Sequence, residues 1–304
     1  MALEFELINW IKNQDREIGS DILTDIGDDM AIVQFGNEKL LITADMLLQG
    51  RHFDLDQTPL EDVGYKAMAC SLSDCAAMAS LPVAAIVSVA LPTDMTMIQA
   101  QKLHAGIQKA AKSYNCPVIG GDTTSWPQPL AINITMFAKT DGIEPVMRSG
   151  AQTDDIIMVT GTLGGSLAGK HLNFQPRINE ARQLAQMVKI NAMMDISDGL
   201  AGDLPHICDQ SKVSAIINAK DIPISDQGQK TKDPLIAALA DGEDFELLFT
   251  VKPADCAKIQ QNCSIQSQLQ ITPIGIIIEA SEEKVYIRDG QETRPLTIKG
   301  FQHF

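Results

Sequence analysis

Segments typical of β-strands alternate with segments typical of helices along the whole chain of 304 residues. The run VAAIVSVAL at residues 83–91 is rich in Val and bounded by prolines, which indicates a strand. A helical pattern follows over residues 95–114, for which Asp94 is the expected N-cap. Mixing of this kind predicts an α/β or α+β fold. The length of the chain is sufficient for two domains.

A polar, turn-rich stretch at residues 140–155 separates two such mixed regions. We therefore predict an N-terminal domain at residues 1–147 and a C-terminal domain at residues 148–304. In the first domain, residues 59–79 have a helical pattern, with an interruption expected around residues 71–74. In the second domain, a helix is expected to begin in the glycine-rich turn that follows the first strand.

The composition excludes several classes of partner. The net charge of −15 argues against nucleic acid and against anionic membrane surfaces, since binding to both depends on Lys and Arg. The longest apolar stretch, LPVAAIVSVALP, has about 12 residues, well below the roughly 20 needed to span a bilayer. The N-terminal residues carry acids and lack the apolar core of a signal peptide. The six cysteines form no C-x-x-C pair, which favours free thiols in a reducing compartment. We expect a cytoplasmic protein.

Aspartates recur where an apolar segment is expected to give way to a loop. Their positions are Asp28, Asp29, Asp45, Asp74, Asp122, Asp195 and Asp198. Asp45 in ITAD and Asp122 in IGGD are expected to end strands, where sheets commonly build sites. Any one aspartate could simply cap a helix or start a turn. Together they predict a site for Mg²⁺ or Ca²⁺, hard cations that prefer oxygen ligands.

An acidic site of this size would repel a phosphate group unless divalent cations lay between them. Phosphoryl transfer assisted by Mg²⁺ is therefore the leading hypothesis. One segment, GGSLAGKH at residues 164–171, places Gly164, Gly169 and Lys170 at the spacing of a phosphate-binding P-loop. The next residue, His171, cannot replace the Ser or Thr hydroxyl that a P-loop offers to Mg²⁺, so we do not expect a P-loop.

A set of motifs occurs in a characteristic order over most of residues 20–250. The motifs are IGDDMAIV, ITAD…GRHF, YKAMACSLSDCAAMAS, VIGGDTT, MRSGA…DDIIMVTGTLGGSLAG, MMDISDGLAGDLPHI and GEDFELLFT. This ordered set resembles the thiamine-monophosphate kinase family, and the closing KGFQHF resembles the C-terminus of that family. The family belongs to the superfamily of aminoimidazole ribonucleotide synthetase and selenophosphate synthetase. The resemblance implies two α/β domains, with the N-terminal sheet joining that of a partner in a homodimer.

The resemblance also implies a reaction and a set of residues. The γ-phosphoryl group of ATP would be transferred directly to the phosphate of thiamine monophosphate, giving thiamine diphosphate without a covalent catalytic residue. The residues implied to bind several Mg²⁺ ions are Asp29, Thr43, Ala44, Asp45, Asp74, Asp122, Asp195 and Asp198. Those implied to contact ATP are Gly121, Asp122, Arg148 and Ser197. Those implied to contact thiamine monophosphate are His52, Glu243 and Phe301.

Some alternatives remain open at the level of sequence. Arg148 could form an ion pair between domains, and Phe301 could be a packing anchor. The resemblance implies that the glycine-rich segment is a turn into the first helix of the second domain, with Lys170 at the surface.

Three features depart from the family pattern: Ala44 replaces the usual Thr, Ser71 replaces the usual Asn, and the stretch between the glycine-rich turn and MMDISD is short. The alternatives are a diverged superfamily member with another phosphate acceptor, or a non-catalytic protein that binds Mg²⁺ and nucleotide.

Overall fold

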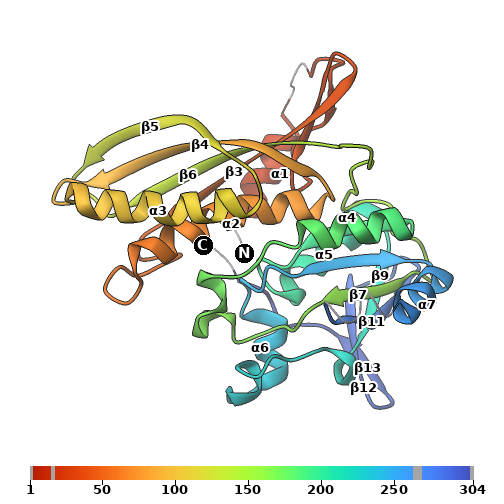
Figure 1. Cartoon of the computed structure of the whole chain (residues 1–304). Coiled ribbons are helices and arrows are strands. Elements are labelled where there is room, and N and C mark those ends of the chain that lie inside the picture. Colours follow the sequence, from red (N-terminus) through yellow and green to blue (C-terminus); the bar gives the residue numbers. More distant parts are fainter. Residues whose placement is uncertain (1–2, 15–17, 263–268, 302–304) are drawn as a thin grey trace.

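The computed structural model describes residues 3–14, 18–262 and 269–301, which form two mixed β-sheets with helices packed against them (Figure 1). The first sheet has the strand order β1-β2-β3-β6-β4-β5. Its strands are β1 (Ile22–Thr24), β2 (Ala31–Phe35), β3 (Glu38–Leu48), β4 (Leu81–Pro92), β5 (Val118–Trp126) and β6 (Ala131–Lys139). Only β4 and β5 are parallel neighbours in this sheet. The accompanying helices are α1 (Leu3–Lys12), α2 (Leu60–Ala77) and α3 (Met97–Ser113).

The second sheet has the order β13-β12-β9-β11-β7-β10-β8, with β9 and β12 parallel and the other neighbours antiparallel. Its strands are β7 (Ile156–Thr160), β8 (Ile190–Asp195), β9 (Ser214–Asn218), β10 (Leu247–Val251), β11 (Ile271–Ile278), β12 (Val285–Asp289) and β13 (Glu292–Pro295). Its helices are α4 (Ile178–Met187), α5 (Leu200–Ser211), α6 (Pro234–Ala240) and α7 (Pro253–Gln261), with 3₁₀ turns η1 (Ser166–Ala168), η2 (Lys170–Leu172), η3 (Ala219–Asp221) and η4 (Gly228–Lys230). This arrangement confirms an α/β fold with two mixed sheets.

Helices α2 and α3 cover one face of the first sheet (Figure 1). Their contact is unusually close, because a Cβ atom on Gly106 would lie 1.8 Å from the carbonyl oxygen of Glu61. On β6, Ile132 and Ile134 turn toward this layer and are buried, while Asn133 between them is half-buried. The period-2 pattern of β6 therefore sets which face of the sheet receives the helices.

Helix α2 also contacts the second domain, through α4 and β8. Buried side chains of α2 such as Met68 and Leu72 belong to the same apolar cluster as Met193 and Phe249 of the second sheet. A second cluster fills the opposite side of that sheet, against α5 and α6. Side chains on α2 can therefore contact residues of both domains, so this helix can contribute to a site that lies between them.

Helix α2 runs without a break through Ser71 and Asp74, so the predicted interruption was wrong. The hydroxyls of Ser71 and Ser73 donate to carboxylates outside the helix, so they do not disrupt it. The prediction of Asp94 as the N-cap of α3 was also wrong. Thr96 is the cap and forms a capping box with Gln99.

Two strands continue past the aspartates that were expected to end them. β3 ends at Leu48 and β5 ends at Trp126. Asp45 pairs with Ile134, and Asp122 pairs with Ser88 in the neighbouring strand. The backbone ladder therefore continues even where an acidic side chain interrupts the apolar pattern.

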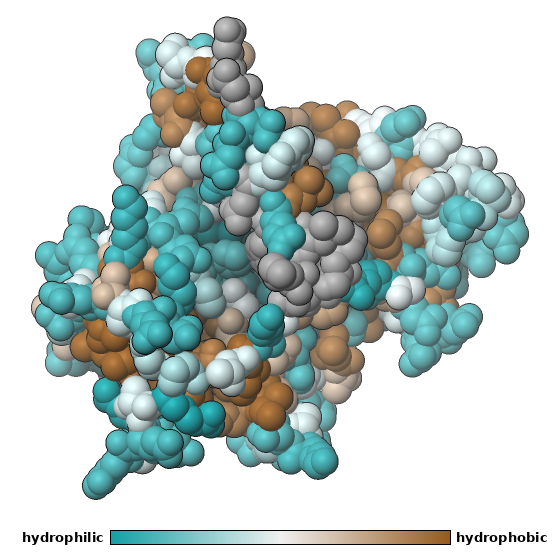
Figure 2. Space-filling view, turned by 180° about the vertical axis from the view of Figure 1, so that it is seen from behind, coloured by the Kyte–Doolittle hydropathy of each residue, from teal (hydrophilic) through white to brown (hydrophobic). Residues whose placement is uncertain are grey.

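The prediction that a helix begins in the glycine-rich turn was wrong, because this segment forms the 3₁₀ turns η1 and η2. Among the described residues, no helix combines the length and the apolar character that a membrane crossing requires. On the face drawn in Figure 2, hydrophilic residues predominate and hydrophobic ones form several separate groups. This distribution agrees with the strongly acidic composition.

Candidate active site

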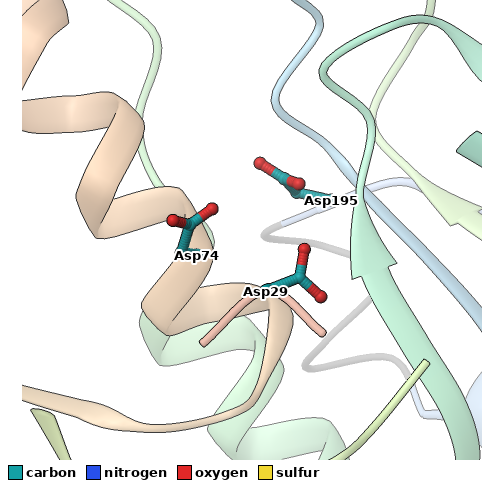
Figure 3. A group of neighbouring side chains, drawn as sticks. All are labelled: Asp29, Asp74 and Asp195. Carbon is teal, nitrogen blue, oxygen red and sulfur yellow. The ribbon is translucent and has the colours of Figure 1, made fainter. Parts of the chain in front are cut away.

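Three of the predicted metal ligands converge between the two domains (Figure 3). Asp29 comes from the turn before β2, Asp74 from α2 and Asp195 from the end of β8. Each offers an oxygen atom, and the three oxygens lie within 4.8 Å of one another. Asp195 lies where the apolar strand β8 gives way to the loop before α5, which agrees with the predicted position of these aspartates. An oxygen-only donor set of this kind fits a hard divalent cation such as Mg²⁺.

Hydroxyl groups hold two of these carboxylates in place. Thr43 Oγ1 donates to Asp74 Oδ2 at 2.5 Å, and Ser73 Oγ donates to Asp195 Oδ2 at 2.5 Å. Each hydrogen bond uses one carboxylate oxygen and leaves the other free to bind a cation. Thr43, implied by the resemblance to bind metal, lies within β3 and not in a turn, and its side chain supports Asp74.

Asp45 lies beside this cluster and is held in the same manner. Ser71 Oγ donates to Asp45 Oδ2 at 2.8 Å. The serine that departs from the family pattern therefore still supplies a donor to the site. The pKa of Asp45 is raised above its usual value, mainly by burial and also by the charge of Asp29. The hydrogen bond from Ser71 offsets part of this rise.

Mutual repulsion shapes the electrostatics of the cluster. Burial, followed by the charges of Asp45 and Asp195, raises the pKa of Asp74 well above its usual range. Burial and then the charge of Asp29 raise the pKa of Asp195 to about 7. Carboxylates that repel one another in this way gain from a shared divalent cation. The residues present therefore fit a Mg²⁺ site.

Arg148 neutralises part of this negative charge. Its guanidinium donates to Asp29 from Nη2 at 2.6 Å and from Nε at 3.1 Å, in a two-pronged contact. Its backbone N–H donates to Asp28 Oδ1 at 3.2 Å. The ion-pair alternative for Arg148 is therefore the geometry observed, and its contact with ATP stays a prediction.

A cavity of about 430 Å³ opens next to the acidic cluster. Predicted site residues of all three kinds line it: Ala44, Asp45, His52, Ser197, Asp198, Glu243 and Phe301. The guanidinium carbon of Arg51 lies 4.7 Å from the centre of the Phe301 ring, and the Phe301 backbone N–H donates to the Asp198 carbonyl at 2.8 Å. The structure thus brings the three predicted substrate contacts to one cavity.

Sequence reasoning missed Lys66, which also lines this cavity. Its side chain is fully buried, and Nζ lies 2.5 Å from Glu243 Oε1 and 2.7 Å from the His52 carbonyl oxygen. A signal was present, because Lys66, Cys70 and Asp74 follow one another at helical spacing on one face of α2. A lysine inside the otherwise uncharged and largely apolar YKAMAC indicates a buried partner of opposite charge.

Asp122 and Gly121 lie apart from the other predicted residues. Both are exposed on the edge strand β5. By register, Asp122 shares its sheet face with Asn133 and Met46, opposite the face that α2 covers. Gly121 has φ +155°, and a Cβ there would lie 1.8 Å from the Val87 carbonyl oxygen, so packing alone requires glycine. The roles of both residues in binding stay predictions.

The glycine-rich segment is not a P-loop. The backbone N–H of Gly164 donates to Asp244 at 3.0 Å, and that of Gly165 donates to Asp241 at 3.0 Å. Amides that would face phosphate in a P-loop are therefore bound to the protein's own carboxylates. Lys170, predicted to lie at the surface, is instead partly buried, with 32% of its side chain exposed. Its Nζ lies 2.8 Å from Glu246 Oε1, a nearly fully buried carboxylate.

Two protein-family models together match most of this chain. Residues 27–140 match the family described as AIR synthase related protein, N-terminal domain, and residues 148–288 match its C-terminal domain. The fold and the paired domains therefore define an AIR synthase-related protein.

Individual relatives indicate which family within this class the chain belongs to. The thiamine-monophosphate kinase of Rhodopirellula baltica is 34% identical over 91% of this chain and 90% of the relative. That of Bacillus subtilis is 33% identical over 99% of both chains. A structure described as AaThiL complexed with AMPPCP and TMP superposes with a TM-score of 0.84 at 31% identity, covering 99% of this chain and 97% of the other. The chain belongs to the thiamine-monophosphate kinase family.

Proposed function

We propose that this protein transfers the γ-phosphoryl group of ATP to thiamine monophosphate, producing thiamine diphosphate. The observation that carries the proposal is one cavity, lined by His52, Glu243 and Phe301, that adjoins a cluster of carboxylates. Asp45 belongs to the cavity wall and interacts electrostatically with Asp74 of the cluster. The relative crystallised with AMPPCP and TMP supports the same pair of substrates.

Each group of residues has a definite part in the proposed reaction. Asp29, Asp74 and Asp195 would hold Mg²⁺, which when bound neutralises charge between two phosphate groups. Glu243 would face the cationic thiazolium ring, and Phe301 would stack on a ring of the substrate. The accepting phosphate oxygen is already largely deprotonated near neutral pH, so no side chain needs to become a nucleophile. Catalysis then rests on in-line positioning and charge neutralisation.

The proposal includes several Mg²⁺ ions and a homodimer formed through β5. All nine residues of this edge strand except Val118 are exposed, and Ile119 is 65% exposed. An edge strand of this kind leaves backbone groups available for pairing with a second chain. Asp122 is kept as a proposed ligand because such pairing would change the surroundings of β5.

The decisive experiment incubates purified protein with ATP, Mg²⁺ and thiamine monophosphate and follows thiamine diphosphate by chromatography. We expect product to form only when all three are present. ATP binding without transfer to any acceptor would favour a non-catalytic Mg²⁺–nucleotide-binding protein. Transfer to another phosphorylated acceptor, but not to thiamine monophosphate, would favour a diverged member of the superfamily.

A further inference from the structure

Three charged or polar side chains meet beside the cavity: Lys66 and Glu243 line it, and His171 contacts Glu243. Lys66 Nζ lies 2.5 Å from Glu243 Oε1, and His171 Nδ1 lies 2.9 Å from Glu243 Oε2. Each carboxylate oxygen of Glu243 therefore has its own nitrogen partner. Lys66 also donates to the carbonyl of His52, which lines the same cavity.

The three side chains come from separate parts of the fold. Lys66 is on α2 of the first domain, His171 is in η2 of the glycine-rich segment, and Glu243 lies between α6 and β10. Glu243 has φ +55°, and its backbone N–H donates to the Ser197 carbonyl at 2.7 Å. A non-glycine residue in this left-handed conformation carries a cost that persists only where surrounding contacts impose it. The backbone and both nitrogen partners thus jointly set the direction of the Glu243 side chain.

The tautomer of His171 is assigned from the contacts of its Nδ1 atom. His171 Nδ1 lies 3.0 Å from Lys66 Nζ as well as 2.9 Å from Glu243. Lys66 keeps a third N–H beyond those that it donates to Glu243 and His52, and an unprotonated Nδ1 would accept from it. A hydrogen on Nδ1 instead donates to Glu243 Oε2, and we assign this tautomer because it gives each carboxylate oxygen its own donor. Burial alone would raise the pKa of Glu243, but the hydrogen bond from His171 and the charge of Lys66 lower it. Glu243 is held as an anion with acceptor sites left over for the cavity.

We propose that Lys66 and His171 are positioning residues that hold Glu243 toward the cavity and so set the preference for a substrate with a cationic ring. This inference rests on the proposed function and adds two residues to it. It also gives a role to the GKH sequence of the glycine-rich segment, which is not a phosphate-binding loop. Lys170 secures the segment on Glu246, and His171 contacts the cavity residue.

The test compares two substitutions of His171. His171→Asn keeps an N–H donor near the position of Nδ1, whereas His171→Leu has similar volume and no donor. For His171→Leu we expect KM for thiamine monophosphate to rise about 10-fold or more, the loss expected for one charge-assisted hydrogen bond. His171→Asn should stay within about 3-fold of the wild type. KM for ATP and the melting temperature serve as controls and should change little in both variants.

A binding measurement separates recognition of the ring from recognition of the phosphate. Thiamine carries the cationic ring without the phosphate, so its inhibition constant should weaken in His171→Leu in parallel with KM. Glu243→Gln removes the charge and keeps the shape of the side chain, and it gives a second test if His171→Leu does not fold. This variant should weaken the binding of thiamine at least as much as His171→Leu.

The outcomes distinguish this inference from the proposed function. An active wild type whose folded His171→Leu variant keeps normal values for both ligands overturns the inference alone. An equal rise in KM for ATP also overturns it, because the effect would then not concern the ring. A wild type that makes no thiamine diphosphate overturns both.

Discussion

Replacement of Asp74 by Asn should stabilise the metal-free protein while removing its function. Oxygens of Asp74, Asp29 and Asp195 lie within 4.8 Å of one another. Two unit charges at this distance repel by about 3 kcal/mol at an effective dielectric constant of about 20. Arg148 offsets part of the charge, and the raised pKa of Asp74 means that proton uptake relieves more of it. A net gain of about 1–2 kcal/mol in the free energy of unfolding remains.

Asn retains the shape of the side chain, and its amide oxygen can still accept the hydrogen bond from Thr43. At about 2–4 °C per kcal/mol, the melting temperature of Asp74→Asn in EDTA should rise by about 2–8 °C. Mg²⁺ should raise the melting temperature of the wild type, because it binds only the folded state, and should have little effect on the variant. Kinase activity should fall by about 100-fold or more. Differential scanning fluorimetry with and without Mg²⁺, together with the kinase assay, measures all three quantities.

Asp122→Asn is the matched control, since it makes the same chemical change at an exposed position outside the cluster. Its melting temperature in EDTA should equal that of the wild type, although its proposed role as a ligand predicts loss of turnover. A melting temperature of Asp74→Asn below that of the wild type in EDTA would refute the argument from repulsion. A full response of that variant to Mg²⁺ would refute the assignment of Asp74 as a ligand.

Two further predictions concern other buried charges. Glu246→Gln should lower the free energy of unfolding by about 3–5 kcal/mol in urea denaturation, because it leaves Lys170 and Arg177 without their buried partner. The exposed Glu144→Gln should leave the urea midpoint unchanged, and equal effects of the two variants would contradict this reasoning. Burial and the nearby charge of Arg148 lower the pKa of His206 from 6.5 to about 4. Burying the neutral imidazole therefore contributes its full stability above pH 6.5, and this contribution is lost as the pH falls toward 4. The melting temperature of His206→Gln relative to the wild type should therefore rise steadily over this range, and a constant difference would rule out this role.

Much of the candidate site could be predicted from local sequence patterns. Asp195 at the strand-to-helix turn and Asp29 in its turn lie where the pattern indicated, since short-range periodicity and turn residues determine such positions. The resemblance also selected His52, Glu243 and Phe301, which the structure places in one cavity. Asp29 and Asp195 follow from local patterns, whereas the three cavity residues were selected only through motifs shared with the family.

Other features depend on which distant segments meet. The sequence left an ion pair of Arg148 open without indicating its partner, and it gave no partner for Lys66. The pairing of Arg148 with Asp29 and of Lys66 with Glu243 joins residues of different domains. Hydrogen bonding of Ser71 to a distant carboxylate explains why α2 continues where an interruption was expected.

The sequence by itself determined the alternation of strands and helices and the chemical character of the site, because both arise from side-chain type and local spacing. Only the tertiary structure decided which acids meet, that Asp122 stays apart from them, and that His171 and Lys66 hold Glu243. The reason is physical. Burial and partial charge compensation act through space between segments far apart in the chain, and no local pattern records those distances.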